Sequence, residues 1–259
     1  MIGIEKFRIR ANEVDFRHRL TVPALVNFLQ ETAMHNIGEI GLPMNILHEK
    51  NLGWVLSRLH LLVSRYPKSM EEIKVQTCAH AFEKYQAYRD FRIYDGQNEL
   101  IATAASSWLV FDLEKRQLIA IPDFVKDSVS ICKKETPLFM PKAKLPPLQN
   151  IDYQFYHQVC WHDLDTNNHV NNTFYFQWAL ESLPIKILNH FFVEEWDMIF
   201  KNECFFGEKI IAQAQLSEKL TREQGEEKLT FLLRIIKEVD NKEVIQAKVK
   251  LKSIESFIN

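Results

Sequence analysis

The sequence is poor in cysteine, in long apolar runs and in net charge. Its four cysteines are too few for a dense disulfide framework and too widely spaced for a paired zinc motif. No apolar run approaches the length of a membrane span, and the charged N-terminal residues do not resemble a signal peptide. We therefore expect free thiols, no membrane association and a cytoplasmic protein.

The charge balance also excludes classes of partner. A net charge of −2 results from 32 basic and 34 acidic residues spread along the 259-residue chain, so no overall field would attract nucleic acid. Hydrophobic residues make up 46% of the chain and charged residues 25%, which is typical of a folded protein with a large core.

An internal repeat indicates two domains of the same kind. Residues 14–32 and 164–182 align without a gap at an offset of 150, so that Asp15 matches Asp165. Polar and apolar positions both recur, and each segment leads into a predicted helix. The first covers residues 24–37, and the second starts at its cap Asn172 and ends before Pro184.

Each half opens with one short strand-like run, and four more follow its helix in the same order. The opening runs are predicted at 5–10 and 152–159, and the later ones at 54–66, 72–82, 85–94 and 100–111, and again at 196–206, 209–217, 227–239 and 244–254. Two antiparallel sheets, each wrapped around its own helix, make an α+β fold of the double hotdog type. We expect an N-terminal hotdog at 1–112, a proline-rich linker at 113–150 and a C-terminal hotdog at 151–259.

A polar cluster distinguishes the second copy from the first. Asp165, Asn167 and His169 stand where the first copy has an aspartate and two arginines. In extended backbone, the side chains of these alternate residues would project to one face. The amides near Asn172 and Thr173, at the start of the next helix, would then suit an oxygen that gains negative charge. The cluster therefore indicates a site for a thioester carbonyl.

Two other interpretations concern the same segment. The series Asp163, Asp165, Asn167 is similar to the start of a calcium loop, but Asn168 and Phe174 replace the glycine and glutamate that such a loop needs. We therefore expect no metal. Asp165 is as well suited to holding a turn as to catalysis, because the aspartate is present in both copies.

A second cluster, Asn202-Glu203-Cys204, lies at the end of the strand predicted at 196–206. A cysteine in such a place is more often a small buried residue than a nucleophile. Adjacent residues of a regular strand point to opposite faces, so only one of Glu203 and Cys204 can face His169 unless a bulge intervenes.

The string WHDLDTNNHVNNTFYFQWALESLP, residues 161–184, resembles the signature of the acyl-acyl carrier protein (acyl-ACP) thioesterases of plants and bacteria. Further similarities at 54–58, 89–92, 108–113 and 202–204 extend the resemblance over nearly the whole chain. The resemblance implies a double hotdog fold, no cofactor and the release of free fatty acid from acyl-ACP. Plant members carry a transit peptide that this sequence lacks, so it looks like a bacterial member.

The resemblance also implies the catalytic residues: Asp165, Asn167, His169 and Glu203, with Cys204 at the position of a proposed nucleophile. We expect His169 to take a proton from the attacking water. Asn167 would bind the carbonyl oxygen or the water, Glu203 would act as a second base or position His169, and Asp165 would orient the imidazole or hold the turn. In the alternative, papain-like mechanism, Cys204 attacks and His169 activates it.

The expected function is thus the hydrolysis of acyl-ACP thioesters, which ends fatty acid elongation. The second domain would be catalytic and the first would bind the acyl chain. The partner is acyl carrier protein bearing a fatty acyl chain, and a homodimer is compatible with the repeat. An acyl-CoA thioesterase and a non-catalytic protein that binds acyl thioesters stay open as alternatives. A dehydratase is disfavoured, because Val170-Asn171-Asn172 replaces the Pro-Gly turn expected after its histidine.

Overall fold

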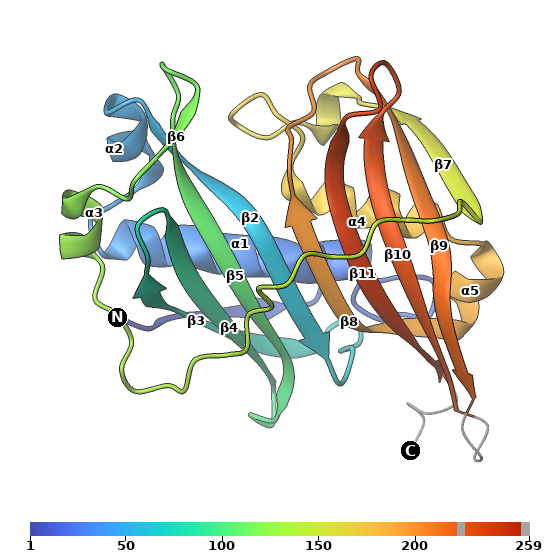
Figure 1. The fold of residues 1–259 in the computed structure, drawn as a ribbon. Helices are drawn as coiled ribbons and strands as arrows, with labels where there is room; N and C mark the ends of the chain where they lie inside the picture. Colours follow the sequence, from blue (N-terminus) through green and yellow to red (C-terminus); the bar gives the residue numbers. More distant parts are fainter. Residues whose placement is uncertain (222–225, 255–259) are drawn as a thin grey trace. The chain divides into compact units, whose positions relative to one another are not determined.

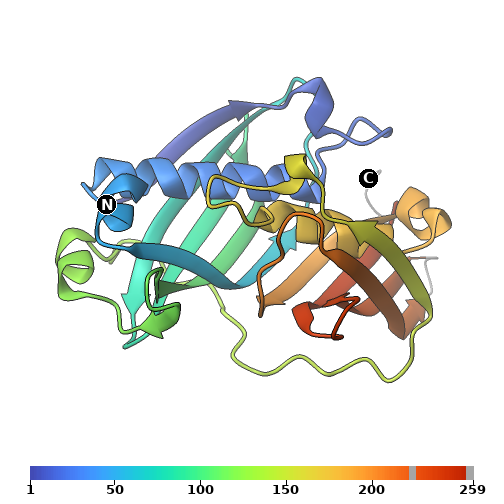
Figure 2. The ribbon, with the colours of Figure 1, turned by 90° about the horizontal axis from the view of Figure 1, so that it is seen from above.

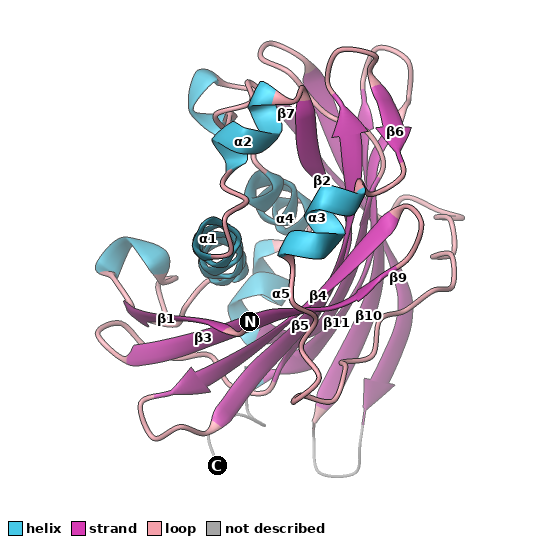
Figure 3. Ribbon diagram, turned by 90° about the vertical axis from the view of Figure 1, so that its left-hand side faces the viewer, coloured by secondary structure: helices cyan, strands magenta, loops and turns pink. Residues whose placement is uncertain are grey.

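The computed structural model describes residues 1–221 and 226–254 (Figure 1). The chain divides into two compact units, Met1–Pro141 and Lys142–Asn259. In each unit an antiparallel sheet curls around one long helix, as the view in Figure 3 shows for α1 and α4. None of the helices in the described part of the chain has the length and hydropathy that a membrane crossing requires.

The first unit contains the sheet order β1-β3-β4-β5-β2, with β6 paired to the end of β5. Its elements are β1 (Gly3–Arg8), α1 (Val22–Glu39), α2 (Met44–Glu49), β2 (Leu52–Val63), β3 (Glu72–Phe82), β4 (Gln86–Asp95), β5 (Leu100–Asp112), β6 (Gln117–Ile119) and α3 (Asp123–Ser128). Helix α1 lies along this sheet (Figure 2). It begins where Thr21 accepts a hydrogen bond from the amide of Ala24, with a proline in its first turn.

The second unit repeats this topology in the order β7-β9-β10-β11-β8. Its elements are β7 (Tyr153–Gln158), α4 (Asn172–Glu181), α5 (Ile185–His190), β8 (Phe191–Phe200), β9 (Lys209–Thr221), β10 (Glu227–Lys237) and β11 (Glu243–Ser253). Helix α4 is buried through aromatic packing: the ring of Phe176 lies 5.1 Å from that of the fully buried Trp196. Each such side chain contributes roughly 1.5–3 kcal/mol by its burial.

The strand predicted at 196–206 has different bounds from β8, which begins at Phe191 and ends at Phe200. Asn202, Glu203 and Cys204 therefore lie in a loop, and the prediction that they belong to a strand is wrong. The chain leaves the sheet here because the amides of Lys201 and Asn202 both bond to the carbonyl of Val244. The rule that adjacent residues point to opposite faces does not apply to this loop.

The first unit extends beyond residue 112, where the sequence suggested its boundary. Residues 113–141 belong to this unit. They contain β6, which pairs with β5, and α3, and they form hydrogen bonds to the sheet. The amide of Cys132 bonds to the carbonyl of Ala79, and the amide of Leu138 bonds to the Asp90 carboxylate. Prolines interrupt regular structure in this segment, but apolar residues such as Val125 still pack into the core.

Candidate active site

Asp165 holds a tight turn between Leu164 and Val170. Its Oδ1 accepts hydrogen bonds from the amides of Asn167, at 2.8 Å, and His169, at 3.3 Å. Asn168 has a φ of 62°, which is a left-handed conformation that asparagine tolerates better than most residues. The expectation of extended backbone at residues 165–169 is therefore wrong. An aspartate side chain that accepts hydrogen bonds from the backbone amides just after it favours a turn over a strand.

The first copy has the same turn. Asp15 Oδ1 accepts from the amides of Arg17, at 2.9 Å, and Arg19, at 3.1 Å, and His18 takes the left-handed position with a φ of 58°. The aspartate thus has the same structural task in both copies, whatever else Asp165 does. The differences between the two turns lie in the side chains at the positions of Asn167 and His169.

A second loop is bonded to each turn at the equivalent place. In the second unit the amide of Val170 donates to the carbonyl of Cys204 at 3.0 Å, and in the first unit the amide of Leu20 donates to that of Pro67 at 2.9 Å. This correspondence makes Tyr66 the counterpart of Glu203. The first copy therefore has arginine and tyrosine where the second has histidine and glutamate.

His169 and Glu203 lie next to each other. His169 Nδ1 is 3.4 Å from Glu203 Oε1, and the two side chains are 25% and 36% exposed, so both are accessible to water. The ring of Phe205 lies edge-on to the imidazole, with the centroids 4.9 Å apart and an interplanar angle of 89°. Phe205 restricts the orientation of His169. The sequence analysis did not identify Phe205, and the one signal in the sequence is its position directly after Cys204.

Asn167 lies on the same turn but is exposed. Its side-chain amide contacts Asp165 Oδ2 at 3.4 Å, and its backbone amide is held by Asp165 Oδ1. The structure thus places Asp165, Asn167, His169 and Glu203 on two adjoining loops. In this arrangement Glu203, rather than Asp165, is the carboxylate nearest to the imidazole.

Cys204 is in a different environment. Its side chain is fully buried, and its backbone amide donates to the hydroxyl of Tyr175 at 3.1 Å. Burial raises the pKa of the Cys204 thiol to about 11, against the opposing effects of Lys237 and the Tyr175 hydroxyl. Among the described residues it makes no hydrogen bond to His169. The thiol is therefore protonated at neutral pH.

The start of α4 differs from the prediction by one residue. Asn171, not Asn172, is the N-cap, and its Oδ1 accepts from both the amide and the hydroxyl of Thr173. The Thr173 amide, expected as a donor to an oxyanion, already has this partner. An anionic oxygen would have to displace the cap to reach it.

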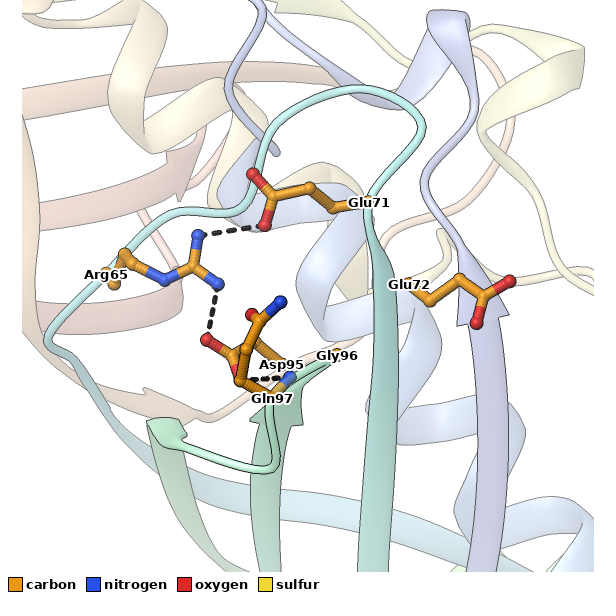
Figure 4. A pocket seen from close by; sticks show the side chains of 6 residues that line it. All are labelled: Arg65, Glu71, Glu72, Asp95, Gly96 and Gln97. Atoms are coloured by element: carbon orange, nitrogen blue, oxygen red, sulfur yellow. Dashed lines mark hydrogen bonds and ion pairs between the residues drawn. The ribbon is translucent and has the colours of Figure 1, made fainter.

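A polar pocket in the first unit contains none of the candidate residues. It is lined by Arg65, Glu71, Glu72, Asp95, Gly96 and Gln97 (Figure 4). The guanidinium of Arg65 donates to Glu71 Oε2 at 2.9 Å and to Asp95 Oδ2 at 2.8 Å. The lining carries one guanidinium and three carboxylates, and both hydrogen bonds given for the guanidinium go to carboxylates of the pocket itself, so the pocket holds no free positive group for an anionic thioester substrate.

The topology of both units defines a double hotdog protein, and solved structures have the same fold. An acyl-ACP thioesterase from Bacteroides thetaiotaomicron has a TM-score of 0.83 and 25% identity, with 96% of this chain and 97% of that chain covered. A 12:0-ACP thioesterase from Umbellularia californica has a TM-score of 0.77 and 22% identity, with 97% of each chain covered. The predicted double hotdog fold is confirmed.

Sequence comparison identifies the family. The model for the acyl-ACP thioesterase N-terminal domain matches residues 4–129, and that for the C-terminal domain matches residues 149–253. The chain belongs to the acyl-ACP thioesterase family. A chloroplastic palmitoyl-acyl carrier protein thioesterase from Gossypium hirsutum is 27% identical over 96% of this chain, and a chloroplastic oleoyl-acyl carrier protein thioesterase from Arabidopsis thaliana is 29% identical over 77%. The chain spans 63% and 59% of the lengths of these relatives.

Proposed function

We propose that this protein hydrolyses acyl-ACP thioesters and releases free fatty acid, with His169 as the base that activates water. The observation that carries the proposal is the pair of His169 and Glu203, 3.4 Å apart and accessible to water. The first copy, with the same backbone turn, has Arg19 and Tyr66 instead. Family membership supplies the reaction, and the pair supplies a base for it.

The chemistry needs a nucleophile more than an acid. The leaving group of a thioester is a thiolate, whose conjugate acid has a pKa of roughly 8.5, so the C–S bond breaks with little protonation. In our proposal water attacks the carbonyl carbon while its proton moves to His169. The carboxylate of Glu203 orients the imidazole and stabilises its protonated form. The thiolate then leaves and takes up a proton.

The two other residues have supporting tasks in this proposal. The exposed amide of Asn167 binds the carbonyl oxygen or the water. Asp165 holds the turn that presents both Asn167 and His169, through its bonds to their backbone amides. The rival in which Cys204 attacks has less support, because the thiol is buried and its pKa is raised to about 11.

We further propose that the first unit binds the acyl chain and that the substrate is delivered by acyl carrier protein in the cytoplasm. No cofactor enters this reaction scheme. A homodimer is compatible with it, and acyl-CoA is the alternative substrate. The relatives from Gossypium hirsutum and Arabidopsis thaliana are named as acyl carrier protein thioesterases, which favours acyl-ACP over acyl-CoA.

The test is hydrolysis of matched acyl-ACP and acyl-CoA substrates, followed through free thiol and fatty acid. His169→Ala should lower kcat/KM on the order of a hundredfold or more, the usual contribution of a general base. Glu203→Gln should lower it less, and His162→Ala, an exposed histidine on the preceding segment, should leave it unchanged. Full activity of His169→Ala would contradict the assigned base. Hydrolysis of acyl-CoA alone would contradict the assigned substrate, and binding without hydrolysis would indicate a non-catalytic protein.

A further inference from the structure

A second group of reactive side chains lies at the end of β7, outside the proposed active site. His157, Cys160 and Asp163 each place a ligand atom within 4.8 Å of those of the other two. His157 Nε2 is 3.0 Å from Asp163 Oδ2, and the same oxygen accepts from the amide of Cys160 at 2.6 Å. The Cys160 thiol is exposed, whereas Asp163 is buried.

Comparison of the two copies shows that these three residues are replacements within an unchanged scaffold. The positions 150 residues earlier hold Phe7, Arg10 and Glu13. Phe7 stacks on Phe28 of α1 with centroids 4.4 Å apart, and His157 packs against Trp178 of α4 at 4.6 Å. In both copies the acidic residue accepts from the backbone amide three positions earlier.

The first copy uses its three positions for a conventional purpose. Phe7 is an apolar ring against the helix, and Arg10 closes an ion pair with Glu13 at 2.6 Å. A phenyl ring cannot bind a metal ion, and the carboxylate of Glu13 is already paired with Arg10, so these three side chains do not form a metal site. In the second copy the same backbone carries an imidazole, a thiol and a carboxylate. These are the three side-chain types that bind zinc in proteins.

We propose that His157, Cys160 and Asp163 form a binding site for a transition metal ion of the zinc class. The three ligands would be His157 Nε2, Cys160 Sγ and one carboxylate oxygen of Asp163. Because Cys160 is exposed, water would occupy the fourth, solvent-facing position. The site was not predicted, because the expected zinc motifs contain paired cysteines and this one contains a single cysteine.

The geometry is close to what such an ion needs. Zinc lies about 2.0–2.3 Å from nitrogen, oxygen and sulfur ligands and binds them tetrahedrally, so two ligands of one ion are roughly 3.3–3.8 Å apart. His157 Nε2 and Asp163 Oδ2 are already 3.0 Å apart, and all three ligand atoms lie within 4.8 Å of one another, so side-chain shifts of about 1 Å would give that spacing. The mixed nitrogen, sulfur and oxygen set favours zinc, cobalt or nickel over magnesium or calcium, which prefer oxygen ligands alone.

Binding would exchange protons but no electrons. The Cys160 thiol, which donates to the carbonyl of Gln158 at 3.2 Å, would lose its proton to solvent and bind as the thiolate. The Nε2 of His157 would bind in its neutral form. The ion would cross-link β7 to the turn that contains Asp163, whose carbonyl accepts the amide of Asn171 at the start of α4.

The test uses the whole protein, freed of metal with a chelator and titrated with Zn²⁺ against a chromophoric competitor. We expect one equivalent to bind, with an affinity that falls at least tenfold in Cys160→Ser and in His157→Phe. The phenylalanine restores the side chain of the first copy, so this variant should keep its fold. Matched controls are Cys132→Ser, a cysteine outside the cluster, and His162→Ala, a neighbouring exposed histidine; both should bind as the parent does.

Co²⁺ provides an independent measurement. Bound at this site, it should show a thiolate-to-metal charge-transfer band that is present in Cys132→Ser and absent in Cys160→Ser. The proposal is overturned if the metal-free protein binds no Zn²⁺, if the band survives in Cys160→Ser, or if His169→Ala abolishes binding that His157→Phe leaves intact. None of these outcomes depends on thioesterase activity, so they are separate from the test of the proposed function.

Discussion

Replacement of Cys204 by alanine distinguishes attack by water from attack by a thiolate. Cys204 is fully buried, and its thiol has a pKa of about 11. At pH 8 such a thiol is ionised to about 0.1%, compared with roughly 10% for a thiol with a pKa of 9. A nucleophilic role would therefore begin with a disadvantage of about a hundredfold. We expect Cys204→Ala to retain kcat/KM within about threefold of the parent protein.

The substitution should disturb the structure little. The bond between residue 204 and the hydroxyl of Tyr175 starts from the backbone amide, so alanine keeps it. The lost sulfur atom leaves a small cavity in a buried site, at a cost of about 1 kcal/mol. For a protein of this size that cost corresponds to a decrease of about 2–4 °C in Tm. A melting curve of the variant gives this control directly.

The assay is acyl-ACP hydrolysis by the parent, Cys204→Ala and His169→Ala, measured from pH 7 to pH 9. If a thiolate with a pKa of about 11 attacked, kcat/KM of the parent would rise roughly tenfold for each pH unit in this range. Attack by water activated by His169 gives no such rise. Equal losses in Cys204→Ala and His169→Ala, together with a steep pH dependence, would refute our reasoning and establish the papain-like mechanism.

Three further predictions concern the turn and the buried thiol. Asp15→Ala and Asp165→Ala should each lower the free energy of unfolding by about 1–3 kcal/mol, because each leaves two backbone amides without their acceptor. Urea unfolding measures this loss. Of the two variants, only Asp165→Ala should also lower thioesterase activity strongly. His169→Arg should keep the stability of the parent within about 1 kcal/mol, since Arg19 occupies the same turn, but should lose activity on the order of a hundredfold; a loss of stability as large as that of Asp165→Ala would show that histidine is needed for folding. Burial raises the pKa of the Cys204 thiol to about 11, so the unfolded chain loses this proton at a lower pH than the folded protein does. The stability that the protonated thiol contributes is therefore complete below pH 9 and is lost as pH rises towards 11, by at most about 3 kcal/mol. The difference in free energy of unfolding between the parent and Cys204→Ala, measured in urea, should shrink over that range.

Much of the fold could be predicted from local patterns. The helix expected at residues 24–37 is α1, Val22–Glu39, and the strand expected at 72–82 has those bounds in β3. Side-chain periodicity and capping residues act over a few positions, so the sequence displays them directly. The dipeptide Asp95-Gly96, which is typical of hairpin turns, likewise lies between the paired strands β4 and β5.

What could not be predicted depends on contacts between distant segments. The loop from Lys201 leaves the sheet because of bonds to Val244, and the turn before α4 is joined to it through Val170 and Cys204. The strand-like run at 196–206 contains no sign of these partners. The same applies to residues 113–141, where the prolines indicated a linker but distant bonds hold the chain along the first unit.

The repeat separates what the fold requires from what the chemistry requires. Both copies keep an aspartate that binds two amides and a loop carbonyl that accepts the amide after the turn. Selection for folding alone explains these features, because each satisfies backbone groups that would otherwise lack partners. It does not explain why His169 and Glu203 face each other in one copy while arginine and tyrosine fill those places in the other. Different side chains on an equivalent backbone turn support the roles that we propose for His169 and Glu203, and the same contrast supports the metal site that we propose at His157, Cys160 and Asp163.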